Sequence, residues 1–200
     1  MTDSEISILL ETSDRLVESA ETDFHRYLHQ EIDWREDLLC IKGPKGTGKT
    51  TLILQHVKEA FGPASDKAVY FSLDNVWFAD HDPIDAIDYF YKNGYTHLFI
   101  DEVHHCQEWS RLIKTATDSY PGLKIAYSGS SILKMDKDQA DLSRRETVYC
   151  LKGMSFREFL EYEGRGRFPV IGYEELKTSH RRIATRICKG LRIIPLFKRY

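Results

Sequence analysis

The segment LLCIKGPKGTGKTTLILQHV, residues 38–57, places three glycines, two lysines and two threonines in eight residues between two apolar runs. Glycine is a poor helix and strand former because it loses the most backbone entropy on ordering. The cluster therefore indicates a backbone that bends sharply or approaches a ligand closely. Residues 43–50 fit the phosphate-loop pattern G-x-x-x-x-G-K-[ST], and the run 38–41 before them is typical of a strand buried on both faces.

The phosphate loop, residues 43–50, is predicted to bind a triphosphate. Backbone N–H groups free of side chains can converge on an anion, and the N-terminus of the following helix adds a favourable dipole. We expect Lys49 to reach the β- and γ-phosphates and the Thr50 hydroxyl to ligate Mg²⁺. The flanking strand and helix disfavour the alternative, a glycine turn with an exposed lysine. The predicted nucleotide-binding residues are Gly43, Pro44, Lys45, Gly46, Thr47, Gly48, Lys49, Thr50 and Thr51.

A pair of carboxylates, Asp101 and Glu102, follows the apolar run 98–100. A strand that ends in a carboxylate places this group at the carboxyl edge of the sheet, where open α/β sheets bind ligands. Asp101 is predicted to hold Mg²⁺ through water, since Mg²⁺ dehydrates reluctantly. Glu102 faces a different direction and is predicted to activate the attacking water as general base. Two solvated carboxylates at the start of a loop are the alternative interpretation.

Short apolar runs recur along the chain, and most are separated by stretches long enough for a helix. This alternation favours an α/β fold, a parallel five-stranded sheet with helices on both faces, because parallel neighbours need crossover connections. The predicted strands are 38–41, 68–71, 97–100, 123–127 and 147–151. The predicted helices include 5–32, 84–93, 108–119 and 174–189, and a further helix that Ser155 caps and Gly164 ends.

Three parts of the chain are distinguished by these patterns. We expect a helical lead-in at 1–34, a phosphate-loop core at 35–152 and a helical extension at 153–200. The last residues are apolar and basic and have no capping glycine. The extension is therefore expected to be the start of a further domain.

One predicted strand, 68–73, lies in the interval between Lys49 and Asp101. An additional strand, with a glutamate directly after the aspartate, resembles the additional-strand, catalytic-glutamate branch of phosphate-loop ATPases. A GTPase would need an Asn-Lys-x-Asp guanine reader, and the nearest sequence, 133–136, lacks the asparagine. Guanine specificity is thus unsupported.

A serine-rich turn, 128–131, follows the fourth predicted strand. In the ATPase branch that the chain resembles, a polar residue at this point senses the γ-phosphate and orients water. The resemblance implies this role for Ser128, with Ser130 as the second choice. A serine-rich turn that caps the next helix is the alternative.

A more specific resemblance covers residues 35–160, which are similar to a family of prokaryotic AAA-type ATPases whose core precedes a separate C-terminal domain. It implies ATP binding and Mg²⁺-dependent hydrolysis. Arg145 aligns with the family arginine, but Arg144 stands where that family usually has glycine. Either guanidinium could therefore face a γ-phosphate, in its own subunit or in a neighbouring one. A surface salt bridge is the alternative for both. The matching residues are Asp101 to His105, Trp109, Pro121 to Ile125, Ser128 to Ser131, Leu142 to Arg145, Leu151 and Ser155 to Leu160.

No run of eighteen apolar residues is present, and the N-terminus is acidic where a signal peptide would be basic and then apolar. We therefore expect a cytoplasmic protein with no membrane partner. The four cysteines are scattered without a C-x-x-C pair and are predicted to be reduced, packed thiols. A zinc site at His104, His105 and Cys106 is disfavoured, since adjacent side chains are expected to point apart.

The net charge of −3 is unevenly distributed, because residues 176–200 contain eight Lys or Arg and no Asp or Glu. A second hypothesis follows, in which ATP occupancy rather than turnover switches contact with nucleic acid or an acidic protein through residues 177–199. A solvated basic face is the alternative. The other expected partners are ATP and, in a homo-oligomer, a second copy of the chain. A phosphate-transferring kinase is a weaker third option.

Overall fold

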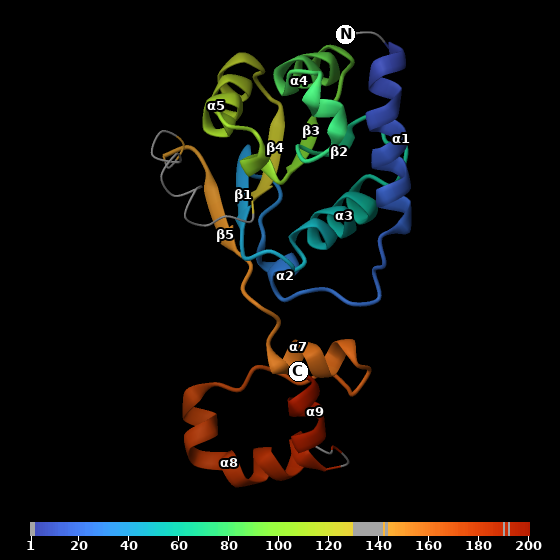
Figure 1. Ribbon diagram of the computed structural model, residues 1–200. Coiled ribbons are helices and arrows are strands. Elements are labelled where there is room, and N and C mark those ends of the chain that lie inside the picture. The colour runs from blue at the N-terminus through green and yellow to red at the C-terminus, as the bar shows by residue number, and fades with distance from the viewer. Residues whose placement is uncertain (1–2, 130–141, 143, 190, 192) are drawn as a thin grey trace. The chain divides into compact units, whose positions relative to one another are not determined.

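The computed structural model describes residues 3–129, 142, 144–189, 191 and 193–200 (Figure 1). The chain divides into two compact units, Met1–Gly153 and Met154–Tyr200, and each is described by itself.

The first unit is built on a five-stranded parallel sheet with the order β2-β3-β4-β1-β5, which confirms the predicted fold class. The strands are β1 (Leu38–Lys42), β2 (Ala68–Ser72), β3 (His97–Asp101), β4 (Lys124–Gly129) and β5 (Thr147–Cys150). In space, β4 separates β1, which leads into the phosphate loop, from β3, which ends in Asp101. The strand that lies between them in the sequence, β2, is at the edge of the sheet.

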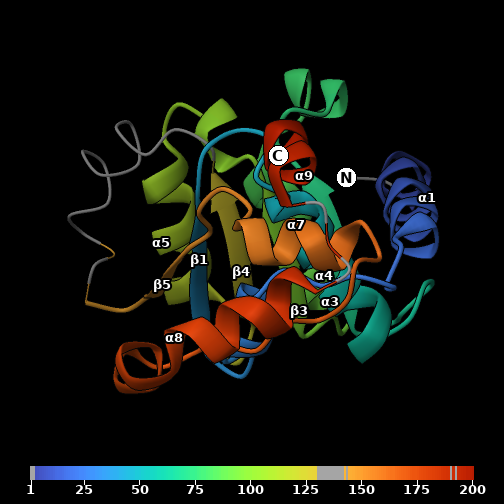
Figure 2. The same cartoon turned by 90° about the horizontal axis from the view of Figure 1, so that it is seen from below.

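The two faces of the sheet carry separate apolar cores, because successive strand residues point to opposite sides. One core holds side chains of α4 (Pro83–Lys92) and α5 (Trp109–Ser119) against Leu38, Cys40, Val69, Leu98, Ile100, Ile125 and Tyr127. The other holds side chains of α3 (Lys49–Ala60) against Leu39, Ile41, Tyr70, Phe99 and Ala126. Viewed from below, α5 and α3 lie on opposite sides of β1 and β4 (Figure 2).

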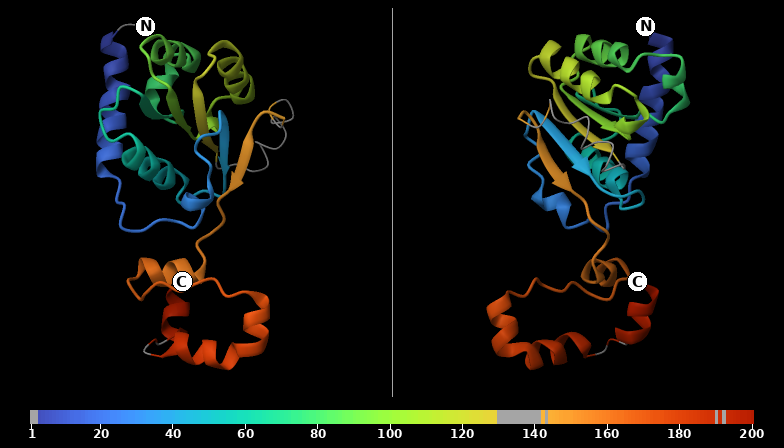
Figure 3. Two further views of the ribbon diagram at one scale, coloured as in Figure 1. Left: turned by 180° about the vertical axis from the view of Figure 1, so that it is seen from behind. Right: turned by 60° about the vertical axis from the view of Figure 1, so that its left-hand side comes forward.

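The N-terminal helix α1 (Asp3–Ser19) covers the edge of the sheet formed by β2 (Figure 3). Its buried residues recur at helical spacing: Ile6, Leu9, Ser13 and Val17. The Ser13 hydroxyl accepts a hydrogen bond from the Tyr70 N–H of β2 at 3.0 Å. The helix thus satisfies a backbone group that an edge strand would otherwise expose.

The predicted single helix over 5–32 is wrong, because α1 ends at Ser19 and only the short α2 (Leu28–Glu31) follows. Carbonyl groups in the last turn of α1 and in the segment that follows it accept hydrogen bonds from side chains of α3. Lys58 Nζ donates to the carbonyls of Glu18 and Ala20 at 2.8 and 2.7 Å. Gln55 Nε2 donates to those of Glu21 and Phe24 at 2.7 and 2.8 Å. These tertiary contacts give the chain a non-helical path in this segment.

The second unit contains α7 (Phe156–Tyr162), α8 (Tyr173–Cys188), which has a non-helical residue at Ser179, and α9 (Ile193–Arg199). The predicted cap of α7 is confirmed, since the Glu158 N–H donates to Ser155 Oγ at 3.3 Å while the Ser155 N–H donates to Glu158 Oε2 at 2.8 Å. Arg199 pairs with Glu163 at 2.8 Å. An aromatic cluster joins α7 to α9 and contains Phe156, Phe159, Phe197 and Tyr200.

The four cysteines are free thiols, and they are not all packed as predicted. Cys40 is fully buried on β1, where burial raises its pKa to about 12 and keeps the thiol inert. Cys150 and Cys188 are exposed, which corrects the expectation of packed thiols at these positions. None of the helices in the described part of the chain has the length and apolar character that crossing a membrane requires.

Candidate nucleotide site

The phosphate loop connects β1 to α3, and its backbone path requires its glycines. Gly46 and Gly48 have φ angles of 81° and 92°, which side chains rarely allow. At Gly43, a Cβ would come within 2.3 Å of the Leu151 carbonyl oxygen. The Leu151 N–H in turn donates to the Lys42 carbonyl at 2.7 Å. The loop is therefore packed against the chain that leaves β5.

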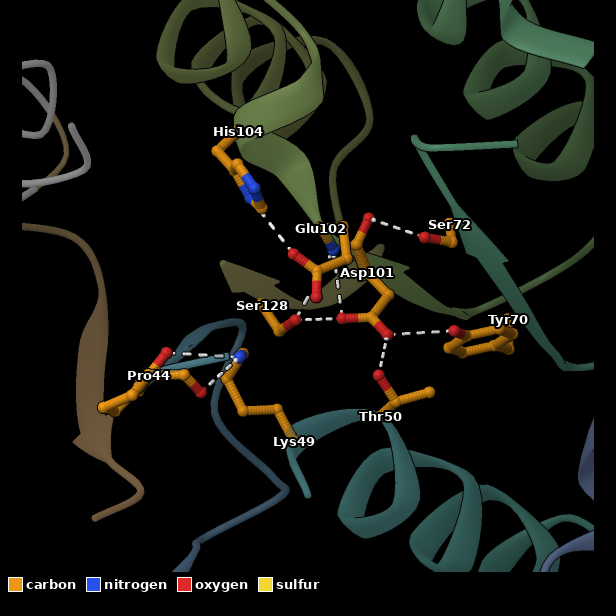
Figure 4. Close-up of polar contacts among 10 residues, drawn as sticks. Pro44, Lys49, Thr50, Tyr70, Ser72, Asp101, Glu102, His104 and Ser128 are labelled. Atoms are coloured by element: carbon orange, nitrogen blue, oxygen red, sulfur yellow. Dashed lines mark hydrogen bonds and ion pairs between the residues drawn. The ribbon is translucent and has the colours of Figure 1, made fainter. Parts of the chain in front are cut away.

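The Lys49 side chain is buried, with 3% of its surface exposed, and points into the loop. Its Nζ donates to the carbonyl oxygens of Gly43 and Pro44 at 3.2 Å each (Figure 4). The loop thus encloses a positive charge that is held by backbone carbonyls. Lys45 and Thr51, which are also predicted to bind nucleotide, are exposed.

Asp101 joins the two predicted motifs, as Figure 4 shows. Its Oδ2 atom accepts a hydrogen bond from Thr50 Oγ1 at 2.5 Å and from the Tyr70 hydroxyl at 2.9 Å. Its Oδ1 atom accepts from Ser128 Oγ and from the Glu102 N–H, the latter at 3.0 Å. Both Asp101 and Ser128 are buried. Four segments that are distant in the sequence therefore meet at one carboxylate.

Tyr70 is a member of this group that sequence reasoning missed. Burial raises the pKa of its phenol well above the usual 10, and the Asp101 charge raises it further. Tyr70 therefore stays protonated and donates to Asp101. The signal in the sequence was weak, because a tyrosine inside an apolar run is typical of a core residue.

Glu102 adopts a left-handed backbone conformation, with φ 51° and ψ 42°, and begins the short 3₁₀ turn η2 (Val103–His105). A non-glycine residue there costs about 1 kcal/mol or more, and such strain clusters at functional sites. Glu102 Oε2 lies 3.2 Å from His104 Nδ1, and both side chains are about one-fifth exposed. The Glu102 carboxylate thus turns away from Asp101 and toward His104 (Figure 4).

A cavity of about 290 Å³ opens beside these residues. Thr50, Asp101 and Glu102 line one part of it. Side chains of α1 and of the loop after β2 line the rest, including Leu9, Leu16, Asp74 and Asn75. Both carboxylates therefore line a hollow between α1, β2 and the first turn of α3, with Glu102 partly exposed and Asp101 buried.

Arg26 is a second residue that sequence reasoning missed. It is 7% exposed, and its guanidinium donates to the Thr47 carbonyl of the phosphate loop and to the Lys152 carbonyl at 2.8 Å. The guanidinium therefore joins the loop to the chain that follows β5. No local pattern marks Arg26, since its partners stand 21 and 126 positions away.

The structure does not bring Arg145 to the other predicted site residues of its own chain. Arg145 lies shortly before β5, which begins at Thr147. Its guanidinium pairs with Asp118 in the last turn of α5. Because β5 runs parallel to β1, its start lies at the amino edge of the sheet and the phosphate loop at the carboxyl edge. Ser130, the second choice for a γ-phosphate sensor, lies outside the described residues.

The prediction that side chains point apart around His104 is also wrong. One ligand atom each from Glu102, His104 and His105 lie within 4.8 Å of one another, and the two imidazole rings are 4.6 Å apart. The tight turn η2 brings these neighbouring residues together, which an extended chain would not do.

Known proteins provide one family match and several structural matches. The family model described as AAA domain matches residues 35–160. Among solved structures, PCH-2 of C. elegans matches with a TM-score of 0.43 and 17% identity over 94% of this chain and 49% of that chain. A structure from work on katanin self-assembly matches with a TM-score of 0.45 and 17% identity, over 89% of this chain and 61% of that chain.

This chain therefore spans about half the length of the PCH-2 chain. No curated protein sequence matches it. The family match extends over more than half of the residues and includes the phosphate loop, Asp101, Glu102 and Ser128. The chain belongs to the AAA domain family.

Proposed function

We propose that this protein binds ATP with Mg²⁺ and hydrolyses it at the site formed by the phosphate loop, Asp101 and Glu102. The observation that carries the proposal is the 2.5 Å hydrogen bond between Thr50 and Asp101. It joins the first turn of α3 to the end of β3, so the phosphate-binding loop and the carboxylate pair serve one ligand. Nucleotide binding agrees with membership of the AAA domain family.

The residues present fit Mg²⁺. The Thr50 hydroxyl and the Asp101 carboxylate are adjacent oxygen donors, which is the ligand type that Mg²⁺ prefers. When bound, Mg²⁺ would neutralise charge on the phosphates. Tyr70 and Ser128 would hold the Asp101 carboxylate in a fixed orientation through their hydroxyl groups.

We assign the phosphates of ATP to the loop and to Lys49. The buried ammonium group is bound by the carbonyls of Gly43 and Pro44, and it is the charged donor inside the loop. A phosphate group is a stronger acceptor for this ammonium than a neutral carbonyl. Binding of ATP would therefore draw Lys49 from the loop carbonyls to the phosphates.

Glu102 is the proposed general base that activates water. Its carboxylate lines the cavity next to Asp101 and pairs with His104 at 3.2 Å. Hydrolysis would require the carboxylate to accept a proton from water, so the contact with His104 must loosen. Ser128 lies between the two motifs on β4 and would orient the water or the γ-phosphate.

Turnover by the Glu102→Gln variant tests this proposal. We expect phosphate release to fall about 10²- to 10⁴-fold, because the amide cannot accept the proton, while ATP binding is retained. Glu108→Gln, which removes an exposed carboxylate at the start of α5, is the matched control and should keep wild-type turnover. Equal rates for Glu102→Gln and wild type would remove Glu102 from the mechanism.

We propose that Arg145 acts on the nucleotide in the site of a neighbouring copy within a homo-oligomer. Its place at the amino edge of the sheet separates it from the phosphate loop of its own chain.

A second candidate function is a nucleotide-gated binding module for nucleic acid or an acidic protein. The observation that favours it is the surface formed by α8 and the residue directly after it, where the basic side chains are exposed: Lys177, Arg181, Arg182, Arg186 and Lys189. Such a surface attracts polyanions through the release of counterions.

A further inference from the structure

Two histidines before the phosphate loop face one carboxylate near the end of α3. His25 Nε2 lies 2.9 Å from Glu59 Oε1, and His29 Nε2 lies 3.3 Å from Glu59 Oε2. The imidazole rings are 4.3 Å apart between centroids. One ligand atom from each of the three residues lies within 4.8 Å of the other two. The three side chains thus converge on one point.

The Nε2 atoms of the two imidazole rings are buried and face the Glu59 carboxylate, at 2.9 Å for His25 and 3.3 Å for His29. Within the part of the chain that the structure describes, neither contact has the geometry of a hydrogen bond. An imidazole nitrogen that carries no proton is the form that ligates a metal.

Two imidazole nitrogens and one carboxylate oxygen are a donor set for Zn²⁺ and related ions. With metal–ligand bonds of about 2.0–2.2 Å, neighbouring ligand atoms of a tetrahedral site lie about 3.3–3.5 Å apart. The observed separations are close to this, at 2.9 Å from His25 Nε2 to Glu59 Oε1 and 3.3 Å from His29 Nε2 to Glu59 Oε2, so each histidine faces a different oxygen of the carboxylate. Glu59 is 41% exposed, so water can complete the coordination. We propose that His25, His29 and Glu59 bind one divalent transition-metal ion of the zinc type.

The location gives the site a structural role. Both histidines flank Arg26, whose guanidinium binds the Thr47 carbonyl of the phosphate loop. Glu59 lies on α3, the helix that begins with Lys49. An ion at this point fixes the non-helical segment after α1 to α3 and holds Arg26 against the loop. The His-x-x-x-His spacing is visible in the sequence, but Glu59 is 30 residues further along.

Zn²⁺ titration of the full chain tests the site without nucleotide, so its outcome is independent of the proposed ATPase activity. The background protein carries His104→Gln and His105→Gln, which removes the second cluster that could bind metal among the described residues. It is stripped with a chelator and titrated against a chromophoric competitor. We expect one Zn²⁺ per chain, a tetrahedral Co²⁺ spectrum, and a rise in Tm of about 5–10 °C at 100-fold excess over Kd. Mg²⁺ should have no such effect.

Single variants then assign the ligands. His25→Gln, His29→Gln and Glu59→Gln, each added to the background, should lower Zn²⁺ affinity by more than about 100-fold. His180→Gln, an exposed histidine on α8, is the control and should leave affinity unchanged. Glu59 is partly exposed, so Glu59→Gln should fold even if a histidine variant does not. Absence of stoichiometric Zn²⁺ binding in the background, or wild-type affinity in folded Glu59→Gln, would overturn the proposal.

Discussion

The Asp101 carboxylate accepts hydrogen bonds from hydroxyl groups on three elements: Thr50 of α3, Tyr70 of β2 and Ser128 of β4. Each hydroxyl offers one proton, and a carboxylate can accept all three. A change of charge at Asp101 therefore affects the hydrogen bonds that this residue makes with α3, β2 and β4. Asp101→Asn, which keeps the shape of the side chain, is the variant that separates metal binding from packing.

Arg26 should contribute to stability through its contacts with the phosphate loop. Arg26→Gln removes charge-assisted hydrogen bonds to the carbonyls of Thr47 and Lys152. We expect the free energy of unfolding to fall by about 2 kcal/mol, and ATP affinity to fall with it, because hydrogen bonds to charged groups contribute about 1.5–3 kcal/mol. Urea unfolding measures the first effect. Arg26→Lys should rescue only part of it, since one ammonium lacks the planar fork that spans both carbonyls. An unchanged urea midpoint for Arg26→Gln would contradict this role.

The residues of the site differ in how visible they were in the sequence. Lys49, Thr50, Asp101 and Glu102 stand in local patterns whose chemistry is specific to phosphate and Mg²⁺. Arg26 and Tyr70 act through contacts with residues far away in the sequence, and neither residue type indicates a ligand by itself. Their roles follow from the folded structure alone.

At the scale of elements, stacked aromatic side chains pack α3 against the segment between α2 and β1. His56 of α3 stacks on Trp34 with ring centroids 3.8 Å apart and planes 3° from parallel. Burial, and then the nearby His29 and His97, lower the pKa of His56 from 6.5 to about 4. Protonation of His56 is therefore unfavourable in the folded protein.

Stability should fall as the pH falls from 7 to 5. Between pH 6.5 and about 4 the unfolded chain binds a proton at His56 that the folded chain does not, so acid favours unfolding. We expect His56 to account for a loss of about 2 kcal/mol in this interval. Urea unfolding at both pH values measures it. His56→Phe keeps an aromatic ring on Trp34 and should show a smaller loss, whereas equal losses in both proteins would contradict the role of His56.

The elements show where local pattern succeeds and where it fails. The apolar runs predicted all five strands, because a strand that is buried on both faces is a short, nearly unbroken run of apolar residues. The apolar runs by themselves did not give the order of the strands, in which β4 lies between β1 and β3. The resemblance to the ATPase branch implied this place for the end of the fourth strand. The break after α1 was missed because side chains of α3, Gln55 and Lys58, bind the carbonyls of that segment.

At the scale of the whole molecule, the two compact units differ in charge and chemistry. The first holds the proposed nucleotide site, and the second carries the basic surface of α8. The family match ends at residue 160, shortly after the second unit begins. The role of the second unit must therefore be tested apart from that of the site.

Charge reversal on α8 tests the binding-module hypothesis. Arg181→Glu, Arg182→Glu and Arg186→Glu together should weaken binding to single- or double-stranded DNA and reduce the slope of log K against log salt by about 3. Binding is measured by fluorescence anisotropy at several salt concentrations, with and without ATP. The control carries Lys67→Glu, Lys92→Glu and Arg111→Glu, an equal change of charge at exposed positions of the first unit. If both triple variants bind as the wild type does, the basic surface of α8 is not a nucleic-acid site.

Calorimetric titration with ATP, with and without Mg²⁺, tests most directly whether the phosphate loop and the carboxylate pair form one site. We expect the wild type to bind ATP more tightly with Mg²⁺, and Lys49→Ala to lose at least about tenfold in affinity, since a charge-assisted contact with phosphate contributes about 1.5–3 kcal/mol. Asp101→Asn should still bind ATP but no longer respond to Mg²⁺. Wild-type affinity in Lys49→Ala, or an undiminished Mg²⁺ response in Asp101→Asn, would show that these residues do not act together on ATP.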